Sequence, residues 1–397
     1  MSSPEIRNER APMQYRRFGK TERMLSVITL GGMRYVHGWE GKRNDLPQDS
    51  IDNCRECTQL ALDAGINHIE TAYGYGKSEH LYGKVLNEEL DVARDRYHLM
   101  TKGRPSTRDE TLKLVERQLR ALRTDHIDLY GWHGLNYAED FEAACGTGRS
   151  VEALHELKRQ GVIGHVGFST HAPLPLILQA IDTDLFEFVN VHYYYFRQRN
   201  EPAVLRAADK DMGVFIISPN DKGGRLYKPS QLLRELTAPL TPIQWNARFC
   251  LRTPHVHTLS FGMTAPSHFD EMRGIFPVSA PLEDRDQRTL ERMDARAAAV
   301  PGGNYEGWEH ERDESGINVP EVLRMRRMLL GYAMESFGRY RYNMFGTGDS
   351  WFPGVKCTEE NLRKLDTSKF PSDVDIKALL RDAHERLDTE DKPETGH

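Results

Sequence analysis

Apolar residues in this chain gather in short, nearly continuous runs, separated by longer stretches in which apolar positions recur every three or four residues. Continuous runs are typical of parallel strands that are covered on both sides, and the longer stretches are typical of amphipathic helices. The runs predict eight strands, at residues 26–32, 67–72, 98–103, 127–133, 165–170, 188–193, 214–219 and 257–262.

Helical patterns lie between the predicted strands. The clearest covers residues 107–122, where Leu112, Val115, Leu119 and Leu122 share one face. Others cover 50–64, 151–159 and 201–210. Eight strand–helix units in about 260 residues predict an α/β fold of the (β/α)8 TIM-barrel type. A doubly wound sheet is the rival architecture, but residues 31–34 lack its glycine-rich fingerprint.

The pattern changes after about residue 275. Residues 280–318 are polar and charged, whereas 320–342 and 372–387 each predict one helix. We therefore expect a flexible arm at 1–12, a barrel at 13–278, an α-helical C-terminal appendage at 279–388 and a disordered tail at 389–397.

Composition excludes several classes of protein. The chain has 397 residues, of which 39% are hydrophobic and 28% charged, as in ordinary globular proteins. A net charge of −6 argues against nucleic acid or an anionic membrane as partner. No apolar run has membrane-spanning length, and the N-terminus lacks the apolar segment of a signal peptide. Five cysteines do not suggest a disulfide framework, so we expect a cytoplasmic protein.

Titratable residues follow or close three consecutive strands. Glu70, Lys102 and His133 stand at predicted strand ends, and Tyr75 lies on the loop after Glu70. A nearby lysine would lower the pKa of the tyrosine, a carboxylate would hold the lysine, and an imidazole would orient a carbonyl group. Each residue alone has an ordinary structural interpretation. Together, at the strand ends where barrels build active sites, they indicate a catalytic proton relay.

The motifs around these residues resemble those of the aldo/keto reductase family, over roughly residues 13–275. The resemblance implies NAD(P)(H)-dependent interconversion of a carbonyl and its alcohol, with Tyr75 as proton donor, Lys102 tuning its pKa, Glu70 holding Lys102 and His133 orienting the substrate. The matching segments are Glu70-Thr71-Ala72-x-x-Tyr75-Gly76-x-Ser78-Glu79, Thr101-Lys102-Gly103, Asp128-Leu129-Tyr130-x-x-His133, Gly167-Phe168-Ser169 and Ile217-Ser218-Pro219.

The resemblance also implies a site for NADP(H) or NAD(H). Tyr193 would stack under the nicotinamide ring, with Ser169 and Asn190 on its carboxamide group. The pyrophosphate would lie along Ser218, Asn220 and Lys222. The remaining implied cofactor-binding residues are Gly32 and Met33, and, near the adenosine, Gly262, Thr264, His268 and Glu271.

The chain departs from the family pattern in several positions. Glu70 replaces the usual aspartate, Asn190 the usual glutamine and Thr170 the usual asparagine. Residues 264–268 contain no lysine or arginine for a 2′-phosphate, so both NADP and NAD stay open, with Arg273 as a candidate cation.

The C-terminal part resembles an appendage that ends in a ferredoxin-like cluster motif in a subset of these reductases. Cys357 matches the start of that motif, but Glu360 and Phe370 replace later cysteines. One thiolate cannot hold a four-iron cluster, so we expect no iron–sulfur cluster and no metal site.

The sequence thus predicts an oxidoreductase acting on a small aldehyde, ketone or sugar, with no oligomeric state implied. Two alternatives stay open. One is a redox-neutral enzyme that retains NAD, such as an epimerase or lyase. The other is a non-catalytic subunit that senses NAD(P), an option that the unusual Glu70 keeps open.

Overall fold

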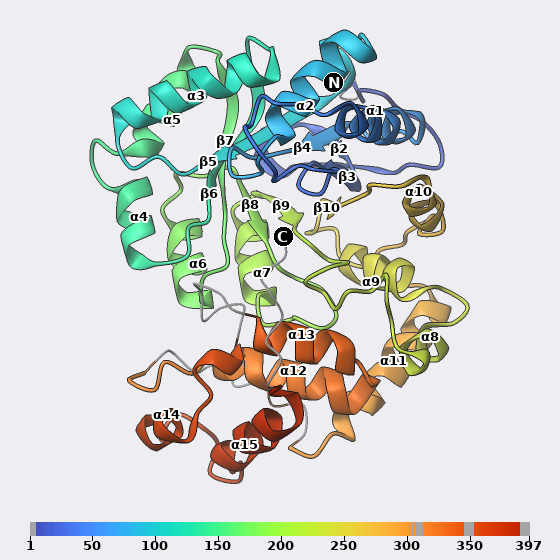
Figure 1. The fold of residues 1–397 in the computed structure, drawn as a ribbon, viewed down its shortest axis with the longest axis vertical. Helices are drawn as coiled ribbons and strands as arrows, with labels where there is room; N and C mark the ends of the chain where they lie inside the picture. The colour runs from blue at the N-terminus through green and yellow to red at the C-terminus, as the bar shows by residue number, and fades with distance from the viewer. Residues whose placement is uncertain (1–4, 303–304, 306–312, 345–352, 390–397) are drawn as a thin grey trace. The chain divides into compact units, whose positions relative to one another are not determined.

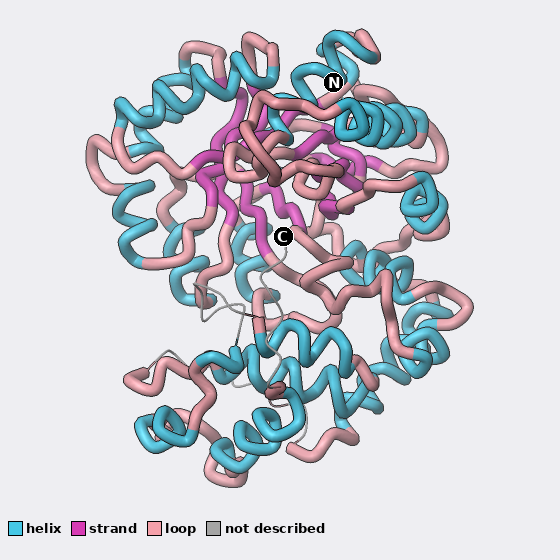
Figure 2. The backbone as a smooth tube through the Cα atoms, in the orientation of Figure 1, coloured by secondary structure: helices cyan, strands magenta, loops and turns pink. Residues whose placement is uncertain are grey.

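The computed structural model describes residues 5–302, 305, 313–344 and 353–389 (Figure 1). The chain divides into two compact units. One contains Met1–Asn220 and Asn246–Leu282, and the other Asp221–Trp245 and Glu283–His397. Among the described residues, all strands belong to the first unit (Figure 2).

Eight parallel strands of the first unit close into a barrel, in the order β10-β3-β4-β5-β6-β7-β8-β9. This confirms the predicted (β/α)8 fold. Each strand lies within or overlaps a predicted apolar run. Their bounds are β3 (Ile28–Gly31), β4 (His68–Glu70), β5 (His98–Gly103), β6 (Ile127–His133), β7 (Ile163–Ser169), β8 (Phe188–Val191), β9 (Gly213–Ile216) and β10 (Thr258–Phe261).

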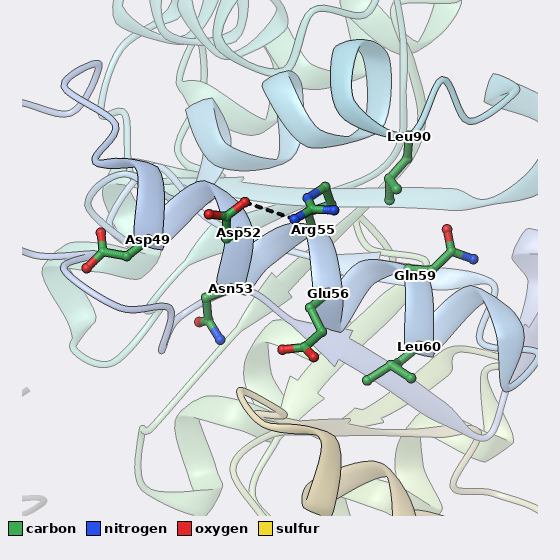
Figure 3. A pocket seen from close by; sticks show the side chains of 8 residues that line it. All are labelled: Asp49, Asp52, Asn53, Arg55, Glu56, Gln59, Leu60 and Leu90. Carbon is green, nitrogen blue, oxygen red and sulfur yellow. Dashed lines mark hydrogen bonds and ion pairs between the residues drawn. The ribbon is translucent and has the colours of Figure 1, made fainter.

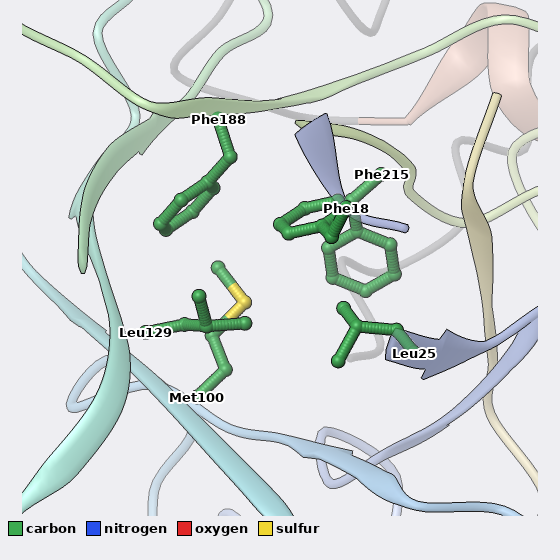
Figure 4. Packing of buried hydrophobic residues seen from close by; sticks show 6 residues of the cluster. All are labelled: Phe18, Leu25, Met100, Leu129, Phe188 and Phe215. Atoms are coloured by element: carbon green, nitrogen blue, oxygen red, sulfur yellow. The ribbon is translucent and has the colours of Figure 1, made fainter. Parts of the chain in front are cut away.

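A short antiparallel hairpin precedes the barrel and completes its core. Its strands are β1 (Tyr15–Arg17) and β2 (Met24–Ser26), joined through η1 (Gly19–Thr21). Phe18 and Leu25 are fully buried and pack against strand residues that face the barrel interior (Figure 4). Those strand residues are Met100, Leu129, Phe188 and Phe215.

Helices cover the outside of the barrel, as the amphipathic patterns predict. The helix predicted at 107–122 is confirmed, and it starts with a capping box in which the Thr107 side chain accepts from the backbone N–H of Glu110. The helices are α1 (Gln48–Asp63), α2 (Ser78–Lys84), η2 (Val85–Glu89), η3 (Arg94–Arg96), α3 (Arg108–Leu122), α4 (Ala138–Cys145), α5 (Ser150–Arg159), α6 (Leu174–Asp182), α7 (Glu201–Asp209), α9 (Pro242–Leu251) and α10 (Pro266–Arg273).

The second unit is helical. The single helix predicted at 320–342 is wrong, because the chain breaks at Ala333, which takes a left-handed conformation with φ of 54°. The helix α11 lies in a segment predicted only as polar. The helices are α8 (Gln231–Thr237), α11 (Asp284–Ala298), α12 (Val319–Tyr332), α13 (Glu335–Asn343), η4 (Pro353–Val355), α14 (Glu359–Lys364) and α15 (Ile376–Leu387).

The segment 221–245 differs from the contiguous barrel expected at 13–278, because it groups with the helical unit. Trp245 is buried there and its indole N–H donates to Asp286 O at 3.5 Å. The hydroxyl of Ser230 donates to Tyr332 O at 2.6 Å. The second unit is therefore assembled from two separate stretches of chain.

The ends of the chain differ in part from expectation. In the predicted arm at 1–12, Arg7 donates to Tyr97 O at 2.6 Å and to Asp128 at 3.0 Å, so this residue is anchored. Residues 1–4 and 390–397, including nearly all of the predicted tail, lie outside the described residues. Across the described ranges, no helix is long and apolar enough to cross a membrane.

Candidate active site

The strand register points Glu70 and Lys102 toward the barrel interior. Glu70 closes β4 and pairs with Met100, which is part of the interior core. Lys102 lies two residues beyond Met100 on β5, and side chains along a strand alternate between its two faces. Both charged residues are almost fully buried, at 3% and 1% exposure. Burial of two charges requires that they compensate each other.

The same register continues around the barrel. His133 at the end of β6 pairs with Ser169, and Ser169 pairs with Asn190 on β8. Asn190 in turn pairs with Phe215, which packs in the interior core. Paired residues on parallel strands face the same side, so His133, Ser169 and Asn190 face the barrel axis as well.

Tyr75 reaches the site from the loop after β4. Its ring meets the ring of His133 edge-on, with centroids 5.6 Å apart. A Cβ atom on Gly74 would lie 3.2 Å from the His133 ring, so the glycine permits this close approach. The structure therefore brings together Tyr75, His133, Glu70 and Lys102, the four residues that the sequence singled out.

Glu70 is the centre of this group. Lys102 Nζ forms an ion pair with Glu70 Oε1 and also donates to Thr71 O at 2.9 Å. The Tyr75 hydroxyl donates to the same Glu70 Oε1 at 3.3 Å. The ammonium group also lies 4.7 Å from the centroid of the Tyr75 ring. The extra methylene of glutamate is thus compatible with the lysine contact and adds a contact to the tyrosine.

The pKa values differ from the sequence expectation. Burial raises the pKa of Tyr75 and lowers the pKa of Lys102 well below its ordinary value. The expected lowering of the tyrosine pKa by the lysine is not found. The physical reason is that desolvation of the buried phenol disfavours its charged form and dominates at Tyr75.

A buried hydrogen-bond network lies behind Lys102, and the sequence motifs do not predict it. Glu79 accepts hydrogen bonds from Thr101 at 2.6 Å and from Gln118 at 2.7 Å. Gln118 also donates to the backbone oxygen of Lys102 at 3.1 Å and accepts from Tyr130 at 2.8 Å. These bonds fix the end of β5. The sequence feature that could have indicated this network is the Ser78-Glu79 pair at the end of the tyrosine motif.

Arginine and lysine side chains also hold the loop that carries Tyr75, and the sequence does not predict these contacts. The Arg43 guanidinium lies over the Tyr73 ring, 3.9 Å from its centroid, and donates to Tyr73 O. Arg117 donates to the Tyr73 hydroxyl at 2.9 Å. The buried Lys77 donates to Lys42 O at 2.7 Å. The loop between β3 and α1 is thus fastened to the loop that carries Tyr75, and no local sequence pattern signals this pairing.

Several implied cofactor residues lie at strand ends of the barrel unit. Ser169 Oγ accepts from Gly134 N at 3.0 Å. Asn190 is fully buried, and its Oδ1 has no hydrogen-bond partner among the described residues. Asn220 Oδ1 is likewise buried and unpartnered within the described chain. Ser218 follows β9 with φ of 52°, a left-handed conformation that is rare outside glycine and is frequent at functional loops.

Two other residues of the implied cofactor site, Tyr193 and Lys222, do not lie at accessible strand ends of the barrel unit. Tyr193 is 1% exposed, and its hydroxyl is held by Glu201 and Arg252, both at 2.7 Å. Phe249 also packs near it, so the ring presents no open face for stacking. Lys222 belongs to the second unit.

The remaining implied residues lie at the ends of β3 and β10. Thr264 N donates to His268 Nδ1 at 3.0 Å. Gly32 is buried and Met33 half-buried after β3, whereas Gly262 is exposed after β10 and Glu271 is half-buried on α10.

A surface groove of about 830 Å³ lies along α1 and contains none of these residues (Figure 3). Arg55 and Asp52 form an ion pair of 2.9 Å in it. Its position and its acidic lining do not match the chemistry gathered at the strand ends. The lining residues are Asp49, Asp52, Asn53, Arg55, Glu56, Gln59, Leu60 and Leu90.

Comparison with known proteins agrees with the fold. The model of the aldo/keto reductase family matches residues 27–231. The chain belongs to the aldo/keto reductase family, which is a family of oxidoreductases.

Among curated proteins, the chain is 25% identical to the uncharacterized oxidoreductase YqkF of Bacillus subtilis over 228 residues, covering 55% of this chain and 68% of YqkF. It is 29% identical to D-arabinose 1-dehydrogenase of Saccharomyces cerevisiae over 153 residues, covering 36% of this chain and only 43% of the yeast enzyme. A solved aldo-keto reductase from Klebsiella pneumoniae in complex with NADPH superposes with a TM-score of 0.56 at 20% identity, covering 71% of this chain and 95% of that one. At this identity the structural likeness shows the fold.

Proposed function

We propose that the protein interconverts a carbonyl compound and its alcohol with NAD(P)(H), and that Tyr75 is the proton donor. The observation that carries this proposal is the contact of Tyr75 and Lys102 with one oxygen of Glu70, beside His133, at the strand ends of the barrel. Charged neighbours change how readily a phenol gives up its proton, and this group places charges of both signs beside Tyr75.

The residues present fit a nicotinamide cofactor. The unpartnered Oδ1 of Asn190 is an acceptor for the amino group of a carboxamide, and Ser169 lies beside it on β7. Phosphate groups commonly bind after the seventh and eighth strands of such barrels, where Ser218 and Gly262 stand. Within the barrel unit, the proposed cofactor set is completed by Asn220, Gly32, Met33, Thr264, His268 and Glu271. The Klebsiella pneumoniae aldo-keto reductase was solved in complex with NADPH, which makes NADP(H) one candidate here, and NAD(H) is the other.

A bound nicotinamide cofactor would supply the hydride. In the direction of reduction, Tyr75 donates its hydroxyl proton to the carbonyl oxygen as negative charge develops there. Lys102, held by Glu70, stabilises the resulting phenolate. His133 donates a hydrogen bond to the same oxygen and orients it toward Tyr75. Oxidation of an alcohol would run through the same groups in reverse.

Purified protein tests this function directly. We expect consumption of NADPH or NADH with a panel of small aldehydes, ketones and sugars, followed by absorbance at 340 nm. Tight binding of cofactor with no turnover of any panel member would contradict the proposal and favour the sensing alternative. A nicotinamide that co-purifies, with isomerisation of substrate and no net change of cofactor, would favour the redox-neutral alternative.

A further inference from the structure

Two histidines lie beyond the proposed cofactor residues on neighbouring strands of the barrel. His171 follows β7 two residues after Ser169, and His192 follows β8 two residues after Asn190. Since Ser169 and Asn190 face the barrel axis, the alternation of side chains brings both histidines to the same side. His133, which contacts Tyr75, lies on the next strand and pairs with Ser169.

The two histidines contact each other directly. His171 Nδ1 lies 2.8 Å from His192 Nε2, and the rings stack with centroids 4.9 Å apart. The other ring nitrogen of His192 lies 3.3 Å from the Tyr194 hydroxyl. The pair is also held through its backbone, because Asn200 donates to His192 O at 2.9 Å and His171 N donates to Asn136 Oδ1 at 2.7 Å.

The hydrogen bonds along Tyr194, His192 and His171 can reverse direction together, because each group can act as donor or acceptor. When His192 Nε2 carries the proton and donates to His171 Nδ1, the Nε2 atom of His171 carries a proton and is a donor. When His171 Nδ1 donates instead, its Nε2 is an acceptor. His192 is fully buried, whereas His171 is half-buried, so His171 is the member that solvent and a ligand can reach.

We propose that His171, oriented by His192, is a specificity-determining residue that binds a hydroxyl group of the substrate beside its carbonyl. A hydroxyl group both donates and accepts, so it matches either state of the pair, whereas an alkyl chain matches neither and would desolvate the imidazole without compensation. This inference rests on the proposed function and narrows its substrate class to hydroxylated aldehydes, including sugars.

The test compares matched substrates of equal chain length. For the parent protein we expect kcat/KM for glyceraldehyde to exceed that for propanal at least tenfold. The variant His171→Phe keeps a planar ring and removes both nitrogen atoms. It should lower kcat/KM for glyceraldehyde about tenfold, mainly through KM, and change kcat/KM for propanal less than twofold. His171→Gln, which still donates and accepts, should recover part of the loss.

His126→Phe is the control, because this half-buried histidine, whose side chain is 39% exposed, precedes β6 at the opposite end of the strands. It should leave both substrates unchanged. Saturation-transfer NMR with arabinitol and 1-pentanol gives a second readout that needs no turnover, and His171→Phe should weaken only the arabinitol signal.

An equal loss for both aldehydes, or no preference in the parent protein, would overturn the inference while leaving the proposed function intact. Absence of turnover with both aldehydes and with the wider panel would overturn the proposed function and this inference with it.

Discussion

The hydroxyl of Tyr75 and the ammonium group of Lys102 share a single carboxylate oxygen, Oε1 of Glu70. An aspartate, usual at this position in the family pattern, is one methylene shorter. Sequence considerations alone suggest that Glu70→Asp would preserve or raise activity, if the carboxylate only holds the lysine. The observed contact with Tyr75 gives the longer side chain a second partner.

We therefore expect Glu70→Asp to lower kcat. Shortening the side chain withdraws the carboxylate by about 1.5 Å, and the flexible lysine can follow it whereas the tyrosine ring cannot. The loss of this one hydrogen bond should lower kcat about tenfold. The measurement is the pH dependence of kcat for the parent protein, Glu70→Asp and Glu70→Gln. The glutamine variant keeps the length and removes the charge, and should lose more. Activity of Glu70→Asp at or above the parent level would show that the tyrosine contact has no role.

Replacement of Tyr75 by phenylalanine removes the proposed proton donor. General acid catalysis contributes about 10²–10⁴-fold to a rate, so kcat should fall at least a hundredfold. Cofactor affinity, measured by quenching of intrinsic fluorescence, should stay within about twofold, since the ring and its contact with His133 remain. Full turnover by this variant would refute the assignment.

The contacts that hold Tyr73 predict an effect of Arg43 on catalysis. Arg43→Ala removes the cation–π contact and the hydrogen bond to Tyr73 O, and should lower kcat roughly fivefold by loosening the loop that carries Tyr75. Arg117→Ala is the matched control, because Arg117 is exposed, donates to the hydroxyl of the same ring and lies farther from the ring centroid, at 5.8 Å. Arg117→Ala should lower kcat less than Arg43→Ala does. Equal effects of both variants on the melting temperature, with kcat unchanged, would contradict a positioning role.

Glu187 predicts how stability responds to acid. Burial alone would raise the pKa of this carboxyl group, but hydrogen bonds from His165 at 2.8 Å and Lys158 at 2.6 Å, with one from Val166 N, lower it to about 2. The folded pKa lies below the unfolded value, so the contribution to stability is complete above about pH 4.5 and is lost as the pH falls toward 2. The contribution amounts to about 3 kcal/mol.

Urea unfolding between pH 2 and 6 measures this contribution. Glu187→Gln should unfold more readily than the parent at pH 6, and the difference between the two proteins should shrink steadily below pH 4.5. A difference that is constant across this range would show that the carboxylate charge does not contribute.

The barrel was predictable because most of its strands lie in short, mainly apolar runs, and because titratable residues gather where those strands end. Boundaries were less predictable. The run at 188–193 continues beyond the end of β8 at Val191, and the chain then turns so that Tyr193 is enclosed by Glu201 and Arg252. Glu201 and Arg252, which are distant from Tyr193 in sequence, determine where its side chain lies. A local sequence pattern cannot predict such contacts.

The helical unit shows the same limit. Ala333 breaks the long helix in a left-handed conformation that alanine rarely adopts, whereas Gly331, the local residue best suited to a break, remains inside α12. The helix α11 buries only a narrow stripe that includes Thr289, Met293 and Ala297 among many charges, too weak a signal to stand out. At Ala333 and in α11, tertiary contacts rather than local sequence preferences determine the backbone conformation.

The barrel strands are interrupted by a stretch that belongs to the other unit. The chain leaves the barrel after Asn220, contributes 221–245 to the helical unit, and returns for its eighth strand. The helical unit is therefore no detachable tail. A gene shortened after Leu282 would still encode Leu226, Leu233 and Trp245, whose buried side chains would lose the neighbours they pack against. An attempt to isolate the barrel therefore has to change the gene at two points, at 221–245 and after Leu282.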